Sequence, residues 1–249
     1  LAMDLSFDYK DFSYFNDFIH KIRINSDISE SSLDMSDIGY FAPDLKNMNN
    51  DITISGLIKG SIDNLKVKDF RFKYGKSTSF FGNIRMNGLP DIRETFINAR
   101  FREFTTSVDD IKKIKIPGEN GQAGKLELQQ SFDKFGNINI KGDFTGFYND
   151  FVANAEVISS LGKLRTDVVI ERGLNEEPVK YNGRIEAERF DFGKFSGLED
   201  SFGKMNLNAD ISGTGLDEES IDIEMNGSID SLDFNDINYN SIAIKGNYK

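Results

Sequence analysis

One stretch of the sequence has the spacing of a calcium-binding loop. Asn208, Asp210, Ser212, Gly213 and Glu219 fall on the first, third, fifth, sixth and twelfth positions of an EF-hand. Such a loop normally begins with Asp and follows a helix, whereas these residues lie on an alternating apolar–polar pattern typical of a strand. A strand that runs into a glycine turn is therefore the better interpretation, and no metal site is predicted.

A second stretch, residues 118–125, has the glycine-rich composition of a phosphate-binding loop. The match fails because Glu119 stands where the P-loop has its first Gly. In addition, Leu126 follows Lys125 at the place where the P-loop requires Ser or Thr. Nucleotide binding is therefore not predicted.

Side chains suited to catalysis are sparse. Carboxylates are grouped at residues 176–177 and 217–219, but both groups lie in polar segments beside Gly or Pro, where solvated turn residues are expected. The chain has no Cys and a single His, His20, which excludes disulfides, thiolate zinc sites, cysteine nucleophiles and metal sites with two histidines. His20 lies in the strand-like run 18–22, where one solvent-facing imidazole needs no functional explanation. We therefore expect no enzymatic activity and no cofactor.

Charge and hydropathy limit the partners of the chain. It carries 41 acidic and 30 basic residues, a net charge of −11, which argues against nucleic acid and against an anionic membrane surface as partners. No apolar stretch approaches the about 20 residues of a membrane span. The N-terminus also lacks the basic and apolar regions of a signal peptide. Because the pattern continues to both ends, we expect an interior segment of a longer protein, with any membrane anchor outside it.

The elements that position the side chains are predicted to be strands. Apolar and polar residues alternate at 52–55, 84–87, 138–141, 207–211 and 221–226. This period of two is typical of strands with one dry and one solvated face, and the apolar runs of buried parallel strands are nearly absent. We predict an all-β fold on an antiparallel sheet, with one or two short helices and a single repetitive segment over residues 1–249.

An irregular repeat accompanies the predicted strands. The pattern apolar–x–apolar–polar–Gly occurs seven times, ending at Gly56, Gly88, Gly142, Gly183, Gly213, Gly227 and Gly246. The spacings between its copies differ, which excludes a propeller or a leucine-rich array. Glycine at these places predicts turns or bulges that let the sheet bend.

Short helices are predicted from local signals. Residues 106–114 have a capping box formed by Thr106 and Asp109, apolar residues three apart and lysines near the end. Residues 36–41, before a proline, form a second short helical candidate. The aromatic stretch 12–19 fits either a helix or an irregular strand.

Four short sequence motifs occur in an order known from one protein family. They are the aspartate–aromatic–Pro element at 36–43, the run at 54–65, Gly-Leu-Pro-Asp at 88–91 and the run at 105–111. Gly-Lys-apolar triplets continue the pattern at 124–126, 162–164 and 203–205. From about residue 20 to residue 249 the chain thus resembles the TamB family, within the wider AsmA-like group. It is similar to an interior stretch of the family's periplasmic region, and the N-terminal membrane helix and C-terminal partner-binding domain would lie outside it.

The resemblance implies an extended antiparallel sheet curled into an open groove, a β-taco, which is apolar inside and polar outside. It implies a periplasmic, non-enzymatic conduit for phospholipid between the inner and outer membranes, with an outer-membrane TamA-like barrel as the partner of regions outside this segment. Exposing an acyl chain to water costs about 0.8 kcal/mol per CH₂, so a continuous apolar groove would lower the barrier to lipid movement. The predicted groove residues are the repeated apolar pairs: Ile52, Ile54, Ile84, Met86, Ile138, Ile140, Val179, Tyr181, Leu207, Ile211, Ile223, Met225, Ile242 and Ile244.

Three alternatives stay open at the level of the sequence. A closed sandwich core would use the same alternating residues as a groove. An assembly factor that binds nascent outer-membrane barrel proteins by edge pairing would instead use the main chain of its strands. An enzyme or adhesin on a β-solenoid would need regular coil lengths, which the spacings do not show.

Overall fold

The computed structural model describes residues 2–34, 51–113, 115–117, 123–125, 130–171, 178–215 and 221–248. The chain divides into two compact units, Leu1–Leu128 with Thr145–Tyr148, and Gln129–Phe144 with Asn149–Lys249. In both units the described residues are mainly antiparallel strand, which confirms the predicted all-β fold. The prediction of a single uninterrupted repetitive segment stays a prediction.

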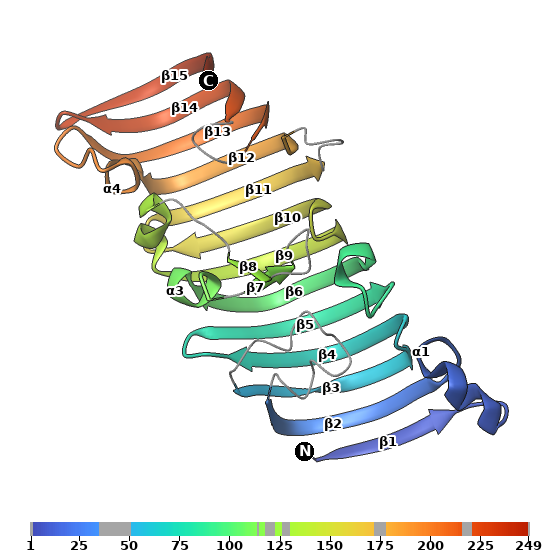
Figure 1. Cartoon of the computed structure of the whole chain (residues 1–249). Helices are drawn as coiled ribbons and strands as arrows, with labels where there is room; N and C mark the ends of the chain where they lie inside the picture. Colours follow the sequence, from blue (N-terminus) through green and yellow to red (C-terminus); the bar gives the residue numbers. More distant parts are fainter. Residues whose placement is uncertain are drawn as a thin grey trace. The chain divides into compact units, whose positions relative to one another are not determined.

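The first unit contains six long antiparallel strands that pair in chain order (Figure 1). Its strands are β1 (Met3–Asp8), β2 (Arg23–Asp34), β3 (Asp51–Ser61), β4 (Asn64–Tyr74), β5 (Thr78–Asn87) and β6 (Phe96–Ser107). Short helices are η1 (Phe12–Asp17), α1 (Phe18–Lys21), η3 (Ile92–Glu94) and α3 (Val108–Ile111). A separate two-stranded ribbon joins β7 (Lys115–Pro117) and β8 (Ala123–Lys125).

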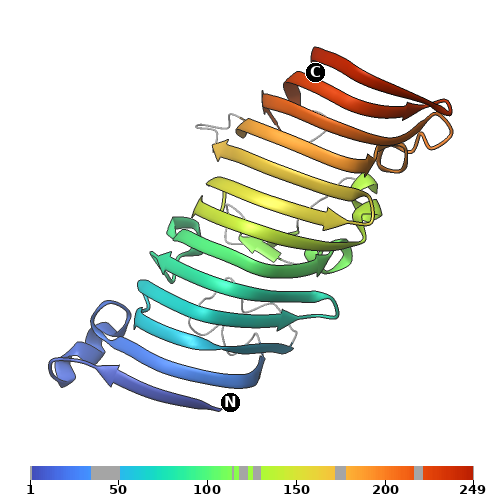
Figure 2. The ribbon, with the colours of Figure 1, turned by 180° about the vertical axis from the view of Figure 1, so that it is seen from behind.

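The second unit repeats this architecture with seven strands in chain order, which Figure 2 shows from the opposite side. They are β9 (Asn137–Phe147), β10 (Asp150–Ser159), β11 (Gly162–Glu171), β12 (Lys180–Asp191), β13 (Phe202–Thr214), β14 (Asp222–Phe234) and β15 (Ile237–Tyr248). The last residues of β9 group with the first unit. The helices of the second unit are η4 (Gln130–Phe135) and α4 (Phe192–Ser196).

The strand register gives each sheet one apolar and one polar face. Between β11 and β12, Leu164 lies opposite Ala187, whereas the adjacent Arg165 lies opposite Glu186. Because successive side chains of a strand point to opposite faces, such pairs alternate between the two faces. The predicted one-sided antiparallel sheet is therefore confirmed.

The predicted curl of the sheet is wrong, because the sheet is open and uncurled within each unit. Within its unit, each long strand contacts other long strands extensively only where they are its hydrogen-bonded neighbours. The sheet therefore does not fold over itself. Within the described ranges, the only other sheet is the β7–β8 ribbon, so no second layer makes a closed sandwich. Alternation of side chains defines two faces but not the curvature of a sheet, and this is why the sequence pattern did not settle the question.

The repeat glycines mark close approaches of neighbouring backbone segments, and Gly88 also opens the turn that follows β5. At six of the seven, an added Cβ atom would come within 3.1 Å of neighbouring backbone atoms, and the seventh, Gly246, has open space around it. Gly56 coincides with a register shift, between Ser55 and Leu57 against β4, as the prediction of bulges at these glycines expects. Glycine is therefore needed where the adjacent strand leaves no room for a side chain.

The short helices differ in detail from the expectation. The helix predicted at 106–114 is shortened to α3, whose N-cap is Ser107 rather than Thr106. The strand-like interpretation of residues 18–22 is wrong, because Phe18–Lys21 is helical and Asp17 pairs with both His20 and Lys21. Pairs at i,i+3 and i,i+4 are those that a helix brings together. The candidate at 36–41 lies outside the described residues.

Candidate functional site

The predicted groove residues of the second unit lie together on the apolar face. Seven of them are joined through direct or next-but-one cross-strand pairs: Tyr181, Leu207, Ile211, Ile223, Met225, Ile242 and Ile244. Ile211 lies opposite Met225, and Gly213 lies between Tyr181 and Ile223. The predicted pairs of separate strands thus form one surface.

Rows of apolar residues cross the strands of this face without interruption. One row runs through Leu164, Ala187, Leu207, Ile229 and Ile242 on five successive strands. At ~4.8 Å per strand, this row is about 19 Å long. It is thus comparable in length to an extended acyl chain and runs perpendicular to the strands.

The first unit has an equivalent apolar face. Ile52 lies opposite Tyr74, and Ile54 lies opposite Phe72. Ile84 and Met86 lie on the same face of β5, where Ile84 pairs with both Val67 and Ala99 and Met86 pairs with both Leu65 and Ile97. The four predicted residues of this unit therefore also lie on the same face.

The other three predicted residues belong to β9 and to the segment before β12. Ile138 and Ile140 share a face of β9 with Phe144, whose ring lies 4.8 Å from that of Phe151. Val179 immediately precedes β12, and its carbonyl accepts a hydrogen bond from the Gly215 N–H. Of the fourteen predicted residues, five are buried and nine are half-buried, so none is fully exposed.

Sequence reasoning missed an aromatic part of the apolar face. Phe80 of β5 packs edge-on against Phe101, with ring centroids 5.6 Å apart, and also contacts Phe70 and Phe104. The Phe72 ring stacks on that of Tyr74 at 6.4 Å. The period-two run Phe70, Phe72 and Tyr74 was the available signal, because alternating aromatic residues indicate one face of a strand as well as aliphatic ones do.

The Tyr181 hydroxyl is a buried polar group on the apolar face. The side chain of Tyr181 is 8% exposed, and its hydroxyl has no hydrogen-bond partner among the described residues. Burial, together with the nearby charge of Asp222, raises the pKa of Tyr181 above its usual value. The hydroxyl is therefore a neutral, unsatisfied donor on a mainly apolar face.

The opposite face of the second unit is a ladder of ion pairs. Glu156 of β10 contacts Lys163 at 2.8 Å and Arg165 at 3.2 Å on β11. On β12, Glu188 lies 4.0 Å from Lys163, and Glu186 lies 3.8 Å from Arg165. The hydrogen bonds from Lys163 and Arg165 lower the pKa of Glu156. Opposite charges thus alternate across the strands and compensate one another on the solvated face.

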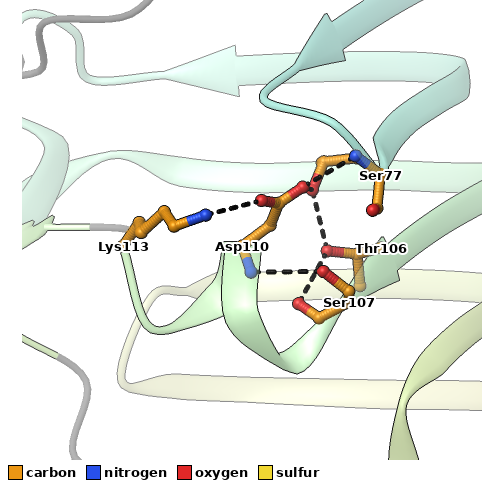
Figure 3. A network of polar contacts seen from close by, with 6 residues as sticks. Ser77, Thr106, Ser107, Asp110 and Lys113 are labelled. Carbon is orange, nitrogen blue, oxygen red and sulfur yellow. Dashed lines mark hydrogen bonds and ion pairs between the residues drawn. The ribbon is translucent and has the colours of Figure 1, made fainter.

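Asp110 is the most deeply buried carboxylate in the described ranges, and Figure 3 shows its surroundings. One of its oxygens accepts hydrogen bonds from the Ser77 N–H at 2.9 Å and from the Thr78 hydroxyl at 3.1 Å, and the other contacts Lys113 at 3.3 Å. Burial alone would raise the pKa of Asp110, but these hydrogen bonds outweigh it and hold the pKa below its usual value. Because its oxygens serve local donors, Asp110 ties α3 to the start of β5 rather than forming a catalytic site.

The calcium-loop spacing has a structural explanation. Asn208, Asp210 and Ser212 lie on the polar face of β13, opposite Ser228, Asn226 and Glu224, and Asn208 accepts a hydrogen bond from Arg184 at 2.8 Å. Glu219, the carboxylate groups at 176–177 and 217–219 and most of the 118–125 segment lie outside the described residues. Among the residues that the structure does describe, no cluster of three or more potential metal ligands occurs.

Comparisons with known proteins add no identity to these observations. In the described part of the chain, no helix has the length and apolar character needed to cross a membrane. No protein-family model, curated protein or solved structure matches the chain.

Proposed function

We propose that this chain is a non-enzymatic lipid carrier that holds acyl chains along the apolar face of its sheet. The observation that carries the proposal is the set of uninterrupted apolar rows, such as the one from Leu164 to Ile242, on a sheet with no second sheet packed against it in the described ranges. A single-layer sheet normally needs a partner for its apolar face. A row of lipid tails meets this need.

The direction of the rows suits transport better than static storage. Because they run from strand to strand, a tail lying on one row passes from one strand to the next without leaving the apolar surface. Each CH₂ kept from water in this way avoids about 0.8 kcal/mol. The charged opposite face keeps the sheet hydrated during this movement, as its ion-pair ladder in the second unit indicates.

The resemblance to the TamB family supplies the proposed setting. In this proposal the chain works in the periplasm, and phospholipid passes between the inner and outer membranes. Regions outside the present sequence anchor the protein and engage an outer-membrane TamA-like barrel. The chain itself contributes the conduit and carries out no covalent chemistry.

Native mass spectrometry of the purified chain tests the proposal through co-purified phospholipid. The variant Ile223→Asp places a charge on a half-buried position of the apolar face, so we expect bound lipid to fall on the order of tenfold or more. The matched control is Ile158→Asp, because Ile158 is 46% exposed and lies opposite Lys163 on the polar face. Equal lipid content in both folded variants, or no lipid on the wild-type chain, would contradict the proposal.

A second candidate function rests on the free sheet edges. Within the described ranges, β1 pairs with β2 alone and β15 pairs with β14 alone, so each has one edge of main-chain groups without a strand partner. Such edges suit an assembly factor that receives nascent barrel strands. Photo-crosslinking from β15 that captures barrel protein, combined with lipid content unaffected by Ile223→Asp, would favour this function over lipid transport.

A further inference from the structure

The polar face of the first unit carries a row of uncompensated positive charge. Lys59 of β3 lies directly opposite Lys66 of β4, which in turn lies directly opposite Arg85 of β5. Asn25 and Asn98 extend this row on the flanking strands β2 and β6. The three cations thus stand on adjacent strands, and the row ends in neutral side chains.

Like charges at directly opposed positions destabilise a sheet. None of Lys59, Lys66 and Arg85 forms an ion pair with another described residue, and all three are exposed. The polar face of the second unit is built differently, because Lys163 and Arg165 share Glu156 there and Arg184 faces Asp210. The same fold can therefore compensate its cations, as it also does for Lys73 and Arg102 in the first unit, but it does not do so for this row.

The total charge makes this contrast sharper. The first unit contains 18 basic and 19 acidic residues, and the second contains 12 and 22. A chain with such an excess of acids has ample carboxylates to pair with three cations. The absence of acids opposite them therefore indicates that the positive charge has a use in the unit that carries it.

A concavity of about 560 Å³ lies beside this row. The cations on its wall are Arg23, Lys59, Lys66 and Lys68, and Asp8 is its one carboxylate. Neutral groups complete the lining, including Asn25, Leu57 and Asn64. The site thus combines four positive charges with one negative charge in a volume suited to a small molecule.

We infer that this concavity binds a small soluble ligand carrying several phosphate groups. Several linked or neighbouring phosphates bring multiple negative charges and many acceptor oxygens in a small volume, which matches lysine and arginine donors standing on adjacent strands. The flat headgroup layer of a membrane would meet the tips of these side chains but would not enter the concavity. Successive side chains of a strand point to opposite faces, and Ile58 lies on the apolar face opposite Val67, so the Lys59 side chain projects away from the proposed lipid surface.

Calorimetric titration of the whole chain with tripolyphosphate tests the inference. We expect saturable binding that weakens as ionic strength rises, because the contacts are between exposed charges. The variant Lys59→Gln/Lys66→Gln should weaken binding by about tenfold for each lysine removed. The conservative variant Lys59→Arg/Lys66→Arg should retain it, which separates loss of charge from loss of fold.

The matched control is Lys163→Gln/Arg184→Gln, which removes the same charge from the polar face of the second unit. It should bind tripolyphosphate like the wild-type chain but melt at a lower temperature, because it breaks contacts to Glu156 and Asp210. Without ligand, Lys59→Gln/Lys66→Gln should melt no lower than the wild type, since repulsion is relieved. Equal binding by the two double variants, no binding by the wild type, or binding only to anionic phospholipid vesicles would overturn the inference. None of these outcomes depends on whether lipid occupies the apolar face.

Discussion

At the scale of single residues, Asp110 shows how one buried carboxylate can hold an element in place. The helix α3 spans only Val108–Ile111, which is too short to be stable by itself. Ser107 caps its first turn by accepting a hydrogen bond from the Asp110 N–H at 3.2 Å. The Asp110 carboxylate then reaches Ser77 and Thr78 at the start of β5. The stability of this corner therefore depends on one side chain and its charge.

Replacing Asp110 by Asn should weaken the corner locally. Asn cannot accept the same set of hydrogen bonds at both oxygens, so we expect a loss of about 1–3 kcal/mol in the stability of this region at neutral pH. Native-state hydrogen exchange at the Ser77 amide measures the effect. The exposed neighbour Asp109 provides the control, and Asp109→Asn should change exchange by less than about 0.5 kcal/mol. Similar protection of Ser77 in both variants would show that Asp110 is not the tether.

The same residue predicts a pH dependence. Because the folded-state pKa of Asp110 lies below its usual value, its stabilising contribution is present above the unfolded-state pKa of about 3.9. The contribution disappears as the pH falls through the lower, folded-state pKa. Acidification should therefore accelerate opening at Ser77 in the wild type more than in Asp110→Asn, once intrinsic exchange rates are taken into account.

The sequence predicted which face of the sheet a residue occupies, but not which residues are its neighbours on that face. Aliphatic pairs such as Ile223 and Met225 were found because alternation reports which face a residue occupies. The opposition of Lys59 and Lys66 was not, because cross-strand neighbours depend on the register between strands, which alternation along one strand does not specify. The polar tether of Asp110 was missed for the same reason, since its partners lie 33 and 32 residues away in the chain.

At the scale of elements, the repeat glycines explain how neighbouring strands approach one another. Gly227 lies opposite Ala209 in the register of β13 and β14. A Cβ atom at Gly227 would overlap the carbonyl oxygen of Asn208. Gly246 has the same place in the repeat, but it lies on β15 and an added Cβ atom would meet nothing within 4 Å. The same repeat pattern therefore occurs both where the neighbouring strand leaves no room for a side chain and where there is room.

This difference gives a prediction with an internal control. Gly227→Ala should lower the free energy of unfolding of the second unit by about 1–3 kcal/mol, because the strand must shift to admit the methyl group. Gly246→Ala should change it by less than about 0.5 kcal/mol. Urea denaturation of both variants, followed by far-ultraviolet circular dichroism, compares the two. If Gly246→Ala proved as destabilising as Gly227→Ala, steric approach of neighbouring strands would not explain the repeat.

Strand elements were more predictable than helices, for a physical reason. A strand of ten or more residues repeats its alternation several times, so one irregular position does not obscure it. The helices are three to six residues long and depend on caps and tertiary contacts. The local pattern Phe-Ile-His-Lys-Ile is typical of a strand, yet these residues begin with the helix α1. Asp17 pairs there with His20 and Lys21.

At the scale of the whole molecule, the open sheets leave strand edges as well as faces available. The strand β1 has β2 as its only strand partner in the described ranges. Its apolar side chains are also accessible, with Met3, Leu5 and Phe7 exposed by 44%, 38% and 37%. Natural sheets usually protect such edges with charges, prolines or bulges. An edge that combines free main-chain groups with exposed apolar residues favours pairing with another strand.

We therefore expect the chain to self-associate reversibly through the β1 edge. Leu5→Lys should suppress this association, because a charge on the apolar side of an edge strand must be desolvated when a second strand is added. Sedimentation velocity over a range of protein concentrations measures the effect. Val152→Lys is the control, because Val152 is 45% exposed but lies on β10, which has strands on both sides. Association that decreases equally in both variants would indicate a general effect of added charge, whereas a decrease confined to Leu5→Lys identifies the edge as the contact.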